Sequence, residues 1–71
     1  MLTFEISMNQ DENGLVSPTV LVAETNSNES LPIILPEQMS KEYGVKLTEK
    51  LVEILKENYT SVSEIREAMY G

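Results

Sequence analysis

The first segment of the chain alternates apolar and polar residues without interruption. Its apolar positions are Leu2, Phe4, Ile6 and Met8, and every residue between them is polar. A period of two places the apolar side chains on one face of an extended backbone. The pattern therefore predicts a strand with one buried face and one face in water.

A second strand is predicted after a short polar turn. The segment "NQDENG" ends in Asn13-Gly14, the pair best suited to positive φ angles in a tight hairpin turn. The following residues, Leu15 to Glu24, are rich in β-branched side chains, so the two segments are expected to form an antiparallel hairpin. Pro18 has no N–H to donate, which predicts that it lies at a bulge or on the solvent side of an edge strand.

A third strand is expected near the middle of the chain. Residues 24–30 contain no apolar side chain and are rich in residues that favour turns. The run Ile33 to Leu35, between Pro32 and Pro36, is too short for a helix, and its β-branched content favours a brief strand. Ile34 is then expected to point away from its two neighbours. If it meets water, it marks an apolar contact point for a partner.

Two or three helices are predicted in the second half. Pro36 suits the first position of a helix, so a short helix is expected from Pro36 to Tyr43, ending at Gly44 as a left-handed C-cap. One continuous helix through Gly44 is the alternative, at a cost of ~1 kcal/mol. The segment from Val45 or Lys46 to Asn58 is the stronger helix, because its apolar side chains recur at helical spacing. Those apolar residues are Leu47, Leu51, Val52, Ile54 and Leu55.

A capping box marks the start of the last helix. In Ser61-Val62-Ser63-Glu64, the Ser61 hydroxyl and the Glu64 carboxylate are placed to accept each other's backbone N–H groups. The helix is expected to run to about Tyr70. Together these segments predict a single α+β domain over residues 1–71, in which a small three-stranded antiparallel sheet packs against two or three C-terminal helices.

The composition argues against an enzyme. The chain has no Cys and no His, so it lacks thiolate ligands, the commonest metal ligand and the usual proton shuttle at neutral pH. Asn9, Asp11 and Asn13 match the start of a calcium-binding loop, but Val20 stands where that loop needs its closing Glu. We therefore expect no catalytic residues, no metal site and no cofactor.

The charge predicts the class of partner. Twelve acidic residues stand against five basic ones, and the formal net charge is −7. Such a chain is repelled by nucleic-acid backbones and anionic lipids and attracted by basic protein surfaces. The last two helices match the outline of a helix-turn-helix, but the acidity of the final helix makes DNA binding the least favoured interpretation. No segment has the pattern of a membrane span or a signal peptide, so a cytoplasmic location is expected.

One row of carboxylates stands out in the strongest helix. Glu49, Glu53 and Glu57 recur every four residues and rise ~6 Å per step, close to the spacing of phosphates along a nucleic-acid strand. This spacing suggests a DNA mimic that occupies a basic groove. The ordinary interpretation is a solvated helix face, in which neighbouring lysines pair with these glutamates at i, i+3. Those lysines are Lys46, Lys50 and Lys56.

The sequence thus predicts a non-enzymatic protein-binding module that engages a basic site on a larger protein. Small acidic chains without cysteine are common among viral and mobile-element proteins that block host factors. By this analogy of composition we expect an inhibitor or adaptor that acts in the cytoplasm, which is that of the host cell if the chain is viral. The residues expected to contact the partner are Glu49, Glu53, Glu57, Glu64, Glu67, Ile34, Tyr59 and Tyr70.

The alternative is a structural homo-oligomer, such as a homodimer. In this interpretation the "LPIIL" strand or the Val45 to Tyr59 helix buries apolar surface across a two-fold axis. Pro18 and Pro32 are expected to limit pairing at the sheet edges. Contact through a helix or a sheet face is therefore favoured over a continuous intermolecular sheet.

Overall fold

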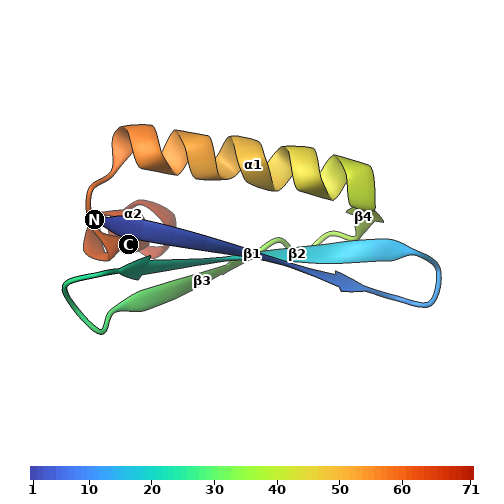
Figure 1. Ribbon diagram of the computed structural model, residues 1–71, viewed down its shortest axis with the longest axis horizontal. Helices are drawn as coiled ribbons and strands as arrows, with labels where there is room; N and C mark the ends of the chain where they lie inside the picture. Colours follow the sequence, from blue (N-terminus) through green and yellow to red (C-terminus); the bar gives the residue numbers. More distant parts are fainter.

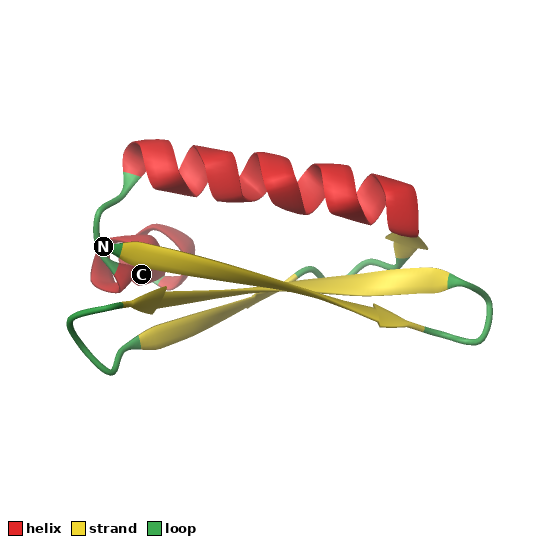
Figure 2. Ribbon diagram, viewed as in Figure 1, coloured by secondary structure: helices red, strands yellow, loops and turns green.

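The computed structural model describes all 71 residues and shows an antiparallel sheet with two helices on one of its faces (Figure 1, Figure 2). The predicted α+β architecture is confirmed. The elements are β1 (Leu2–Gln10), β2 (Leu15–Glu24), β3 (Ser30–Ile34), β4 (Met39–Ser40), α1 (Lys41–Asn58) and α2 (Val62–Tyr70).

β2 is the central strand of the sheet. β1 pairs with it antiparallel along its whole length, from Leu2 opposite Glu24 to Gln10 opposite Val16. On the other side of β2, β3 pairs antiparallel with residues 19–23, and β4 pairs with the first two residues of β2. The long free edge of the sheet therefore lies along β1, and the shorter one lies along β3 and β4.

The turn between β1 and β2 is held by Asp11. Its carboxylate accepts the N–H groups of Asn13 and Leu15, both at 2.9 Å. Only Gly14 has a positive φ, at 83°, so the expectation that Asn13 shares this conformation is wrong. The Asp11 N–H bonds to the Leu15 carbonyl, so the loop between paired residues consists of residues 12–14. A three-residue hairpin loop needs the left-handed conformation only at its last position.

Pro18 lies inside the central strand, and its side chain is fully buried. The prediction of a bulge or a solvent-facing edge position is therefore wrong. The backbone of Pro18 faces β3, where its carbonyl accepts the Leu35 N–H at 3.0 Å. Pairing on this side is interrupted here, because β3 reaches only to Thr19 and β4 only to Val16. The missing N–H falls at that break, where no donor is needed.

α1 is one continuous helix rather than two short ones. The helix expected to begin at Pro36 is absent, because Met39 and Ser40 form β4 and are held extended by pairing with β2. α1 begins directly after β4, where the Ser40 hydroxyl accepts the Tyr43 N–H at 3.3 Å. It then continues through Gly44, which is not a C-cap.

Gly44 marks a close approach of α1 to the sheet. A Cβ atom on Gly44 would lie 2.9 Å from Cγ2 of Val16 and 3.4 Å from side-chain atoms of Met8 and Pro18. Glycine therefore lets the helix backbone rest directly on the hairpin. One turn later, Thr48 is fully buried, and its hydroxyl donates to the Gly44 carbonyl at 2.8 Å, so the buried polar group has a partner.

The core lies between the sheet and the two helices. Alternate residues of β2 and β3 point toward the helices and are buried. α1 spans the length of the hairpin, whereas α2 covers only the end of the sheet where β2 connects to β3 (Figure 1). The core residues are Val20, Val22, Leu31, Ile33, Leu55, Val62 and Ile65.

Carboxylates hold the N-terminal end of α2. The predicted capping box is confirmed: the Ser61 hydroxyl accepts the Glu64 N–H at 3.1 Å, and the Glu64 carboxylate accepts the Ser61 N–H at 3.2 Å. A second carboxylate, that of Glu24 at the end of β2, accepts the Val62 N–H at 2.6 Å. This contact ties the last helix to the central strand.

Candidate functional site

The acidic side chains divide into two groups. Those of the first group accept backbone N–H groups or pair with a base inside the molecule: Asp11, Glu24, Glu29, Glu42 and Glu64. Those of the second group form no hydrogen bond and no ion pair: Glu5, Glu12, Glu37, Glu49, Glu53, Glu57 and Glu67. Only the second group keeps its charge fully available to another molecule.

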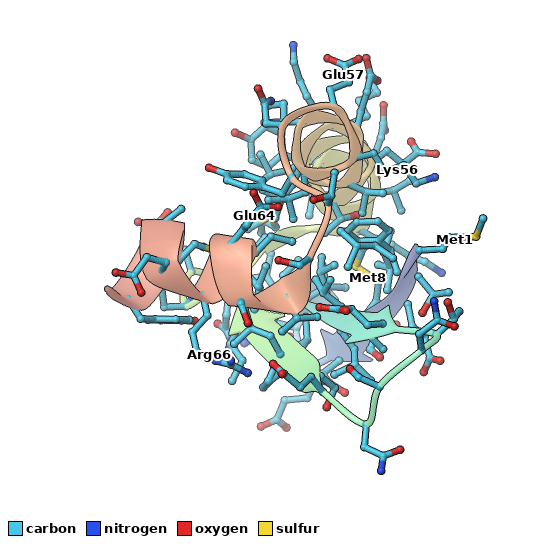
Figure 3. All side chains as sticks on the ribbon, turned by 90° about the vertical axis from the view of Figure 1, so that its left-hand side faces the viewer. Met1, Met8, Lys56, Glu57, Glu64 and Arg66 are labelled. Atoms are coloured by element: carbon cyan, nitrogen blue, oxygen red, sulfur yellow. The ribbon has the colours of Figure 1, made fainter.

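The outward side of α1 carries the predicted row of glutamates. Glu49, Glu53 and Glu57 are all exposed, whereas Gly44, Thr48 and Leu55 form the buried side of the same helix. Figure 3 shows Glu57 pointing away from the sheet at the top of α1. Residues four apart lie close to one line along a helix, with a rise of ~6 Å per step. We call these three residues the acidic row.

The lysines of α1 leave the acidic row without ion pairs. Lys46 pairs with Glu42 at 3.6 Å. Lys56 lies over the ring of Phe4, 5.8 Å from its centroid, on the side of α1 above β1 (Figure 3). Lys50 forms no ion pair. The i, i+3 pairs expected for a solvated helix face are therefore not formed.

Glu64 belongs to the cap of α2. Besides the Ser61 N–H, one of its oxygens accepts the N–H and the hydroxyl of Thr60, at 2.7 and 2.8 Å. Hydrogen bonds to a carboxylate favour its ionised form. The hydrogen bond from the Thr60 backbone N–H has the largest effect and the one from its hydroxyl the next largest. Together they hold the pKa of Glu64 below its ordinary value. Its carboxylate is therefore already engaged within the cap, whereas Glu67 on the same helix is exposed and without a partner in the chain.

The face of the sheet opposite the helices carries the predicted apolar contact point. Ile34 is 64 % exposed, which confirms that it points away from the core. Leu21 on the central strand is 37 % exposed, and Pro32 lies opposite it in the register and is also exposed. These three residues form the open-face patch, which is remote from the acidic row because the sheet lies between them.

The two tyrosines predicted to contact a partner lie in different surroundings. Tyr70 is 63 % exposed near the C-terminal end of α2. Tyr59 is half-buried and packs against the core, so its first role is structural. It also borders an open hollow of about 480 Å³, in which no set of polar groups converges as in a small-molecule site. The hollow is lined by Met1, Leu2, Lys56, Tyr59 and Thr60.

The predicted contact residues do not form one continuous site. The structure groups only the acidic row, and it places the open-face patch on the other side of the sheet and Tyr70 at the end of α2. No three side chains of the metal-binding types come together. Neither helix is long and apolar enough to cross a membrane. The surface carries exposed charge in the acidic row and exposed apolar area in the open-face patch.

Sequence reasoning missed the free edge of β1. The carbonyl of Met1 accepts the Thr25 N–H, and the Asp11 N–H donates to the Leu15 carbonyl, so the odd-numbered residues of β1 bond to β2. Backbone groups alternate along a strand, and the even-numbered residues therefore turn their N–H and C=O groups to the free edge. The groups of this β1 edge belong to Leu2, Phe4, Ile6, Met8 and Gln10. Finding it requires the strand order, which no local pattern encodes.

Comparison of the chain with protein-family models, with curated proteins and with solved structures finds no match in any of the three. The features of the chain that bear on its function are three surfaces: the acidic row, the open-face patch and the β1 edge.

Proposed function

We propose that this chain is a non-enzymatic, acidic protein-binding module that inhibits a larger protein by placing the acidic row in a basic site. The observation that carries the proposal is that Glu49, Glu53 and Glu57 are exposed and have no partner in the chain. Their charge is part of a net charge of −7, which draws a basic surface toward the chain. The encounter takes place in the cytoplasm, that of the host cell if the chain is viral.

The spacing of the row favours a basic site that normally binds nucleic acid. A rise of ~6 Å per step is close to the distance between successive phosphates of one strand. Arginine and lysine side chains that contact phosphates also form charge-assisted hydrogen bonds with carboxylates. A helix with this row therefore presents negative charges to the groove at about the intervals of nucleic-acid phosphates. While the helix is bound, nucleic acid cannot enter the groove.

The structure also gives a reason for tight binding. The acidic row is carried by a helix whose opposite side is fixed to the sheet through Gly44, Thr48 and Leu55. Because the helix is already formed and anchored, little backbone entropy is lost when the carboxylates meet a partner. The row is a preorganised surface.

The test compares three forms of the tagged chain as baits in extracts of the native cell. The first is the wild type. The second carries Glu49→Gln, Glu53→Gln and Glu57→Gln. The third is the matched control, with the same change at Glu5, Glu12 and Glu37, which are also exposed and unpartnered. We expect a basic protein to be retained by the wild type and the control and lost from the row variant.

Two further measurements on the captured protein complete the test. Its association with the wild type should slow steeply with added salt, because long-range attraction between charges is screened. Duplex DNA should displace the chain if the site is a nucleic-acid groove. Equal retention by the row variant, or an association rate that does not respond to salt, contradicts the proposal.

A further inference from the structure

The β1 edge is long and lacks the features that protect most edge strands. Natural sheets protect their edges with Pro, Lys, bulges or very short strands. β1 has nine residues, contains neither Pro nor Lys, and keeps an unbroken register with β2. Its outward N–H and C=O groups have no partner in the chain, so they are ready to pair with another strand.

The opposite edge of the sheet is blocked. Leu35 bonds inward to Pro18, so the alternate residues Ser30, Pro32 and Ile34 of β3 turn their backbones outward. Pro32 has no N–H to offer there. The expectation that prolines limit edge pairing therefore holds for β3 but is wrong for β1, because Pro18 lies inside the sheet.

The sequence of β1 is complementary to itself when two copies run antiparallel. If Ile6 lies opposite Ile6 of a second copy, Phe4 meets Met8, and Glu5 meets Ser7. In the middle of the pair, apolar side chains then face apolar ones on the helix side, and polar ones face polar ones on the open side. At its two ends Leu2 faces Gln10. In this register every outward amide and carbonyl of the strand gains a hydrogen-bonded partner.

The neighbouring register is disfavoured by charge. Moving the two-fold axis by one residue places Glu5 directly opposite Glu5 of the second copy. Like charges in directly opposed positions destabilise a strand pair. Glu5 is the only charged residue of β1, so this contact disfavours the register centred on Glu5. Moving the axis the other way, to Ser7, places Phe4 opposite Gln10 and leaves Leu2 without a partner residue.

Apolar surface above the edge adds to the same contact. Ile6 is 39 % exposed although its side chain lies on the helix side of the sheet. Val45 is 38 % exposed, and Val52 is half-buried. Val52 follows Val45 by seven residues, and Lys56 follows Val52 by four. Residues at these spacings lie on the same side of a helix, so both valines share a side of α1 with Lys56. Lys56 lies over Phe4 of β1, which places Val45 and Val52 above the edge. Glu49 lies four residues after Val45 and shares this side of the helix.

We propose that a second copy of the chain adds its β1 to the β1 edge, antiparallel and centred on Ile6. The product is a two-fold dimer with one continuous sheet. Both α1 helices then lie on the same face of that sheet, so the dimer presents two acidic rows side by side. The dimer does not depend on the proposed inhibitory function, and its test needs no other partner.

The first test measures the dissociation constant by sedimentation from micromolar to millimolar concentration, at moderate salt. Ile6→Pro removes the outward N–H at the two-fold axis, which forms no hydrogen bond within the chain. The dissociation constant of the dimer should therefore rise roughly tenfold or more. Ile34→Pro makes the same change at an outward position of β3 and should leave the dissociation constant unchanged. Circular dichroism verifies that both variants fold.

The second test examines the register and does not depend on a proline. In the proposed register, Ser7 faces Glu5 of the second copy, and symmetry repeats the contact. Ser7→Lys should tighten the dimer roughly threefold to tenfold, and Ser7→Glu should weaken it by a similar factor. Asn9→Lys and Asn9→Glu change the net charge equally but face Thr3, so they should differ much less. If Ile6→Pro does not fold, the comparison of the two Ser7 variants with the two Asn9 variants decides whether the dimer forms in the proposed register.

Three outcomes overturn the proposal. The first is a wild type that remains monomeric at millimolar concentration. The second is a dimer that is weakened by Ile34→Pro and not by Ile6→Pro, which assigns the contact to the open-face patch. The third is a monomer whose β1 amides become protected from hydrogen exchange only on addition of a lysine-rich peptide, which assigns the edge to a basic segment of another protein.

Discussion

α1 and α2 cover the same face of the sheet but are held there by different means. α1 rests on the hairpin by close contact, with Gly44 against Val16 and the following turn buried. α2 inserts two fully buried side chains and has its first turn bonded to carboxylates, including that of Glu24. Both helices bury apolar side chains, because Leu55 of α1 belongs to the same core. The position of the acidic row depends in addition on shape, whereas the position of α2 depends in addition on charge.

The largest effect is expected from the apolar anchor of α2. Ile65→Ala removes a fully buried side chain from the core and should lower the free energy of unfolding by about 3 to 4 kcal/mol. Urea unfolding followed by circular dichroism measures the loss. Met69→Ala on the same helix is the control and should cost less than about 1 kcal/mol, because Met69 is half exposed. A similar cost for both variants would mean that α2 is not anchored through Ile65.

The shape dependence of α1 is tested at Gly44. Gly44→Val places a branched side chain against Val16 and should cost about 2 to 3 kcal/mol of stability. Gly44→Ala should cost less, because alanine regains ~1 kcal/mol of helix propensity. Combining Gly44→Val with Val16→Ala should cost less than the sum of the two changes, as expected for residues in contact. Additive effects would show that the close approach is not a constraint.

The charge dependence of α2 is tested at Glu24. Glu24→Ala removes the carboxylate that accepts the Val62 N–H, and it should lower the free energy of unfolding by about 1 to 2 kcal/mol. Glu24→Gln keeps a neutral acceptor and should cost less. Glu37→Gln, at an exposed position without a partner, should change stability by less than about 0.5 kcal/mol. An unchanged unfolding midpoint for Glu24→Ala would show that the hydrogen bond between Glu24 and Val62 does not stabilise the position of α2.

The smallest effect is expected from Glu64 and appears as a pH dependence. Its pKa is lower in the folded chain than its ordinary value of 4.5, because it accepts hydrogen bonds from Thr60 and Ser61. Its contribution to stability is therefore complete above about pH 4.5 and is lost as the pH falls through the lower folded pKa. Glu64→Gln retains the cap without titrating, so its stability should decline less steeply in acid. Parallel pH profiles for the two proteins would contradict this.

Local patterns were sufficient to predict several elements. The alternation from Leu2 to Met8 predicted β1, because side chains of a strand with one buried face must alternate. The spacing of Ser61 and Glu64 predicted the start of α2, because a capping box is formed by residues close in sequence. Alternation also predicted that Ile34 is exposed.

Other elements depend on contacts between distant residues. Pro36 and Gly44 have the local properties of a helix start and a helix end, yet α1 begins at Lys41 and passes through Gly44. The pairing of β4 with β2 delays the helix, and the close approach to Val16 makes glycine necessary within it. No pattern within residues 36–44 contains this information.

The same limit applies to the candidate site. Helical spacing was enough to predict the acidic row, but the pairing of Lys46 with Glu42 rather than Glu49 depends on side-chain conformations. The sequence predicted that Glu64 caps α2, but the further hydrogen bonds from Thr60 to its carboxylate could not be predicted from the capping-box spacing. The β1 edge escaped notice because the sequence does not show which strand lies at the centre of the sheet.

The bond between Glu24 and Val62 also bears on how the chain folds during its synthesis. Its two residues are 38 positions apart, and Leu31 and Ile33 of the core are covered only when the last helix arrives. A ribosome adds residues more slowly than a helix or hairpin forms, so the emerging chain carries an uncovered apolar face until α2 has been made. A chain released after Asn58 should therefore bind a hydrophobic dye, and the full chain should not.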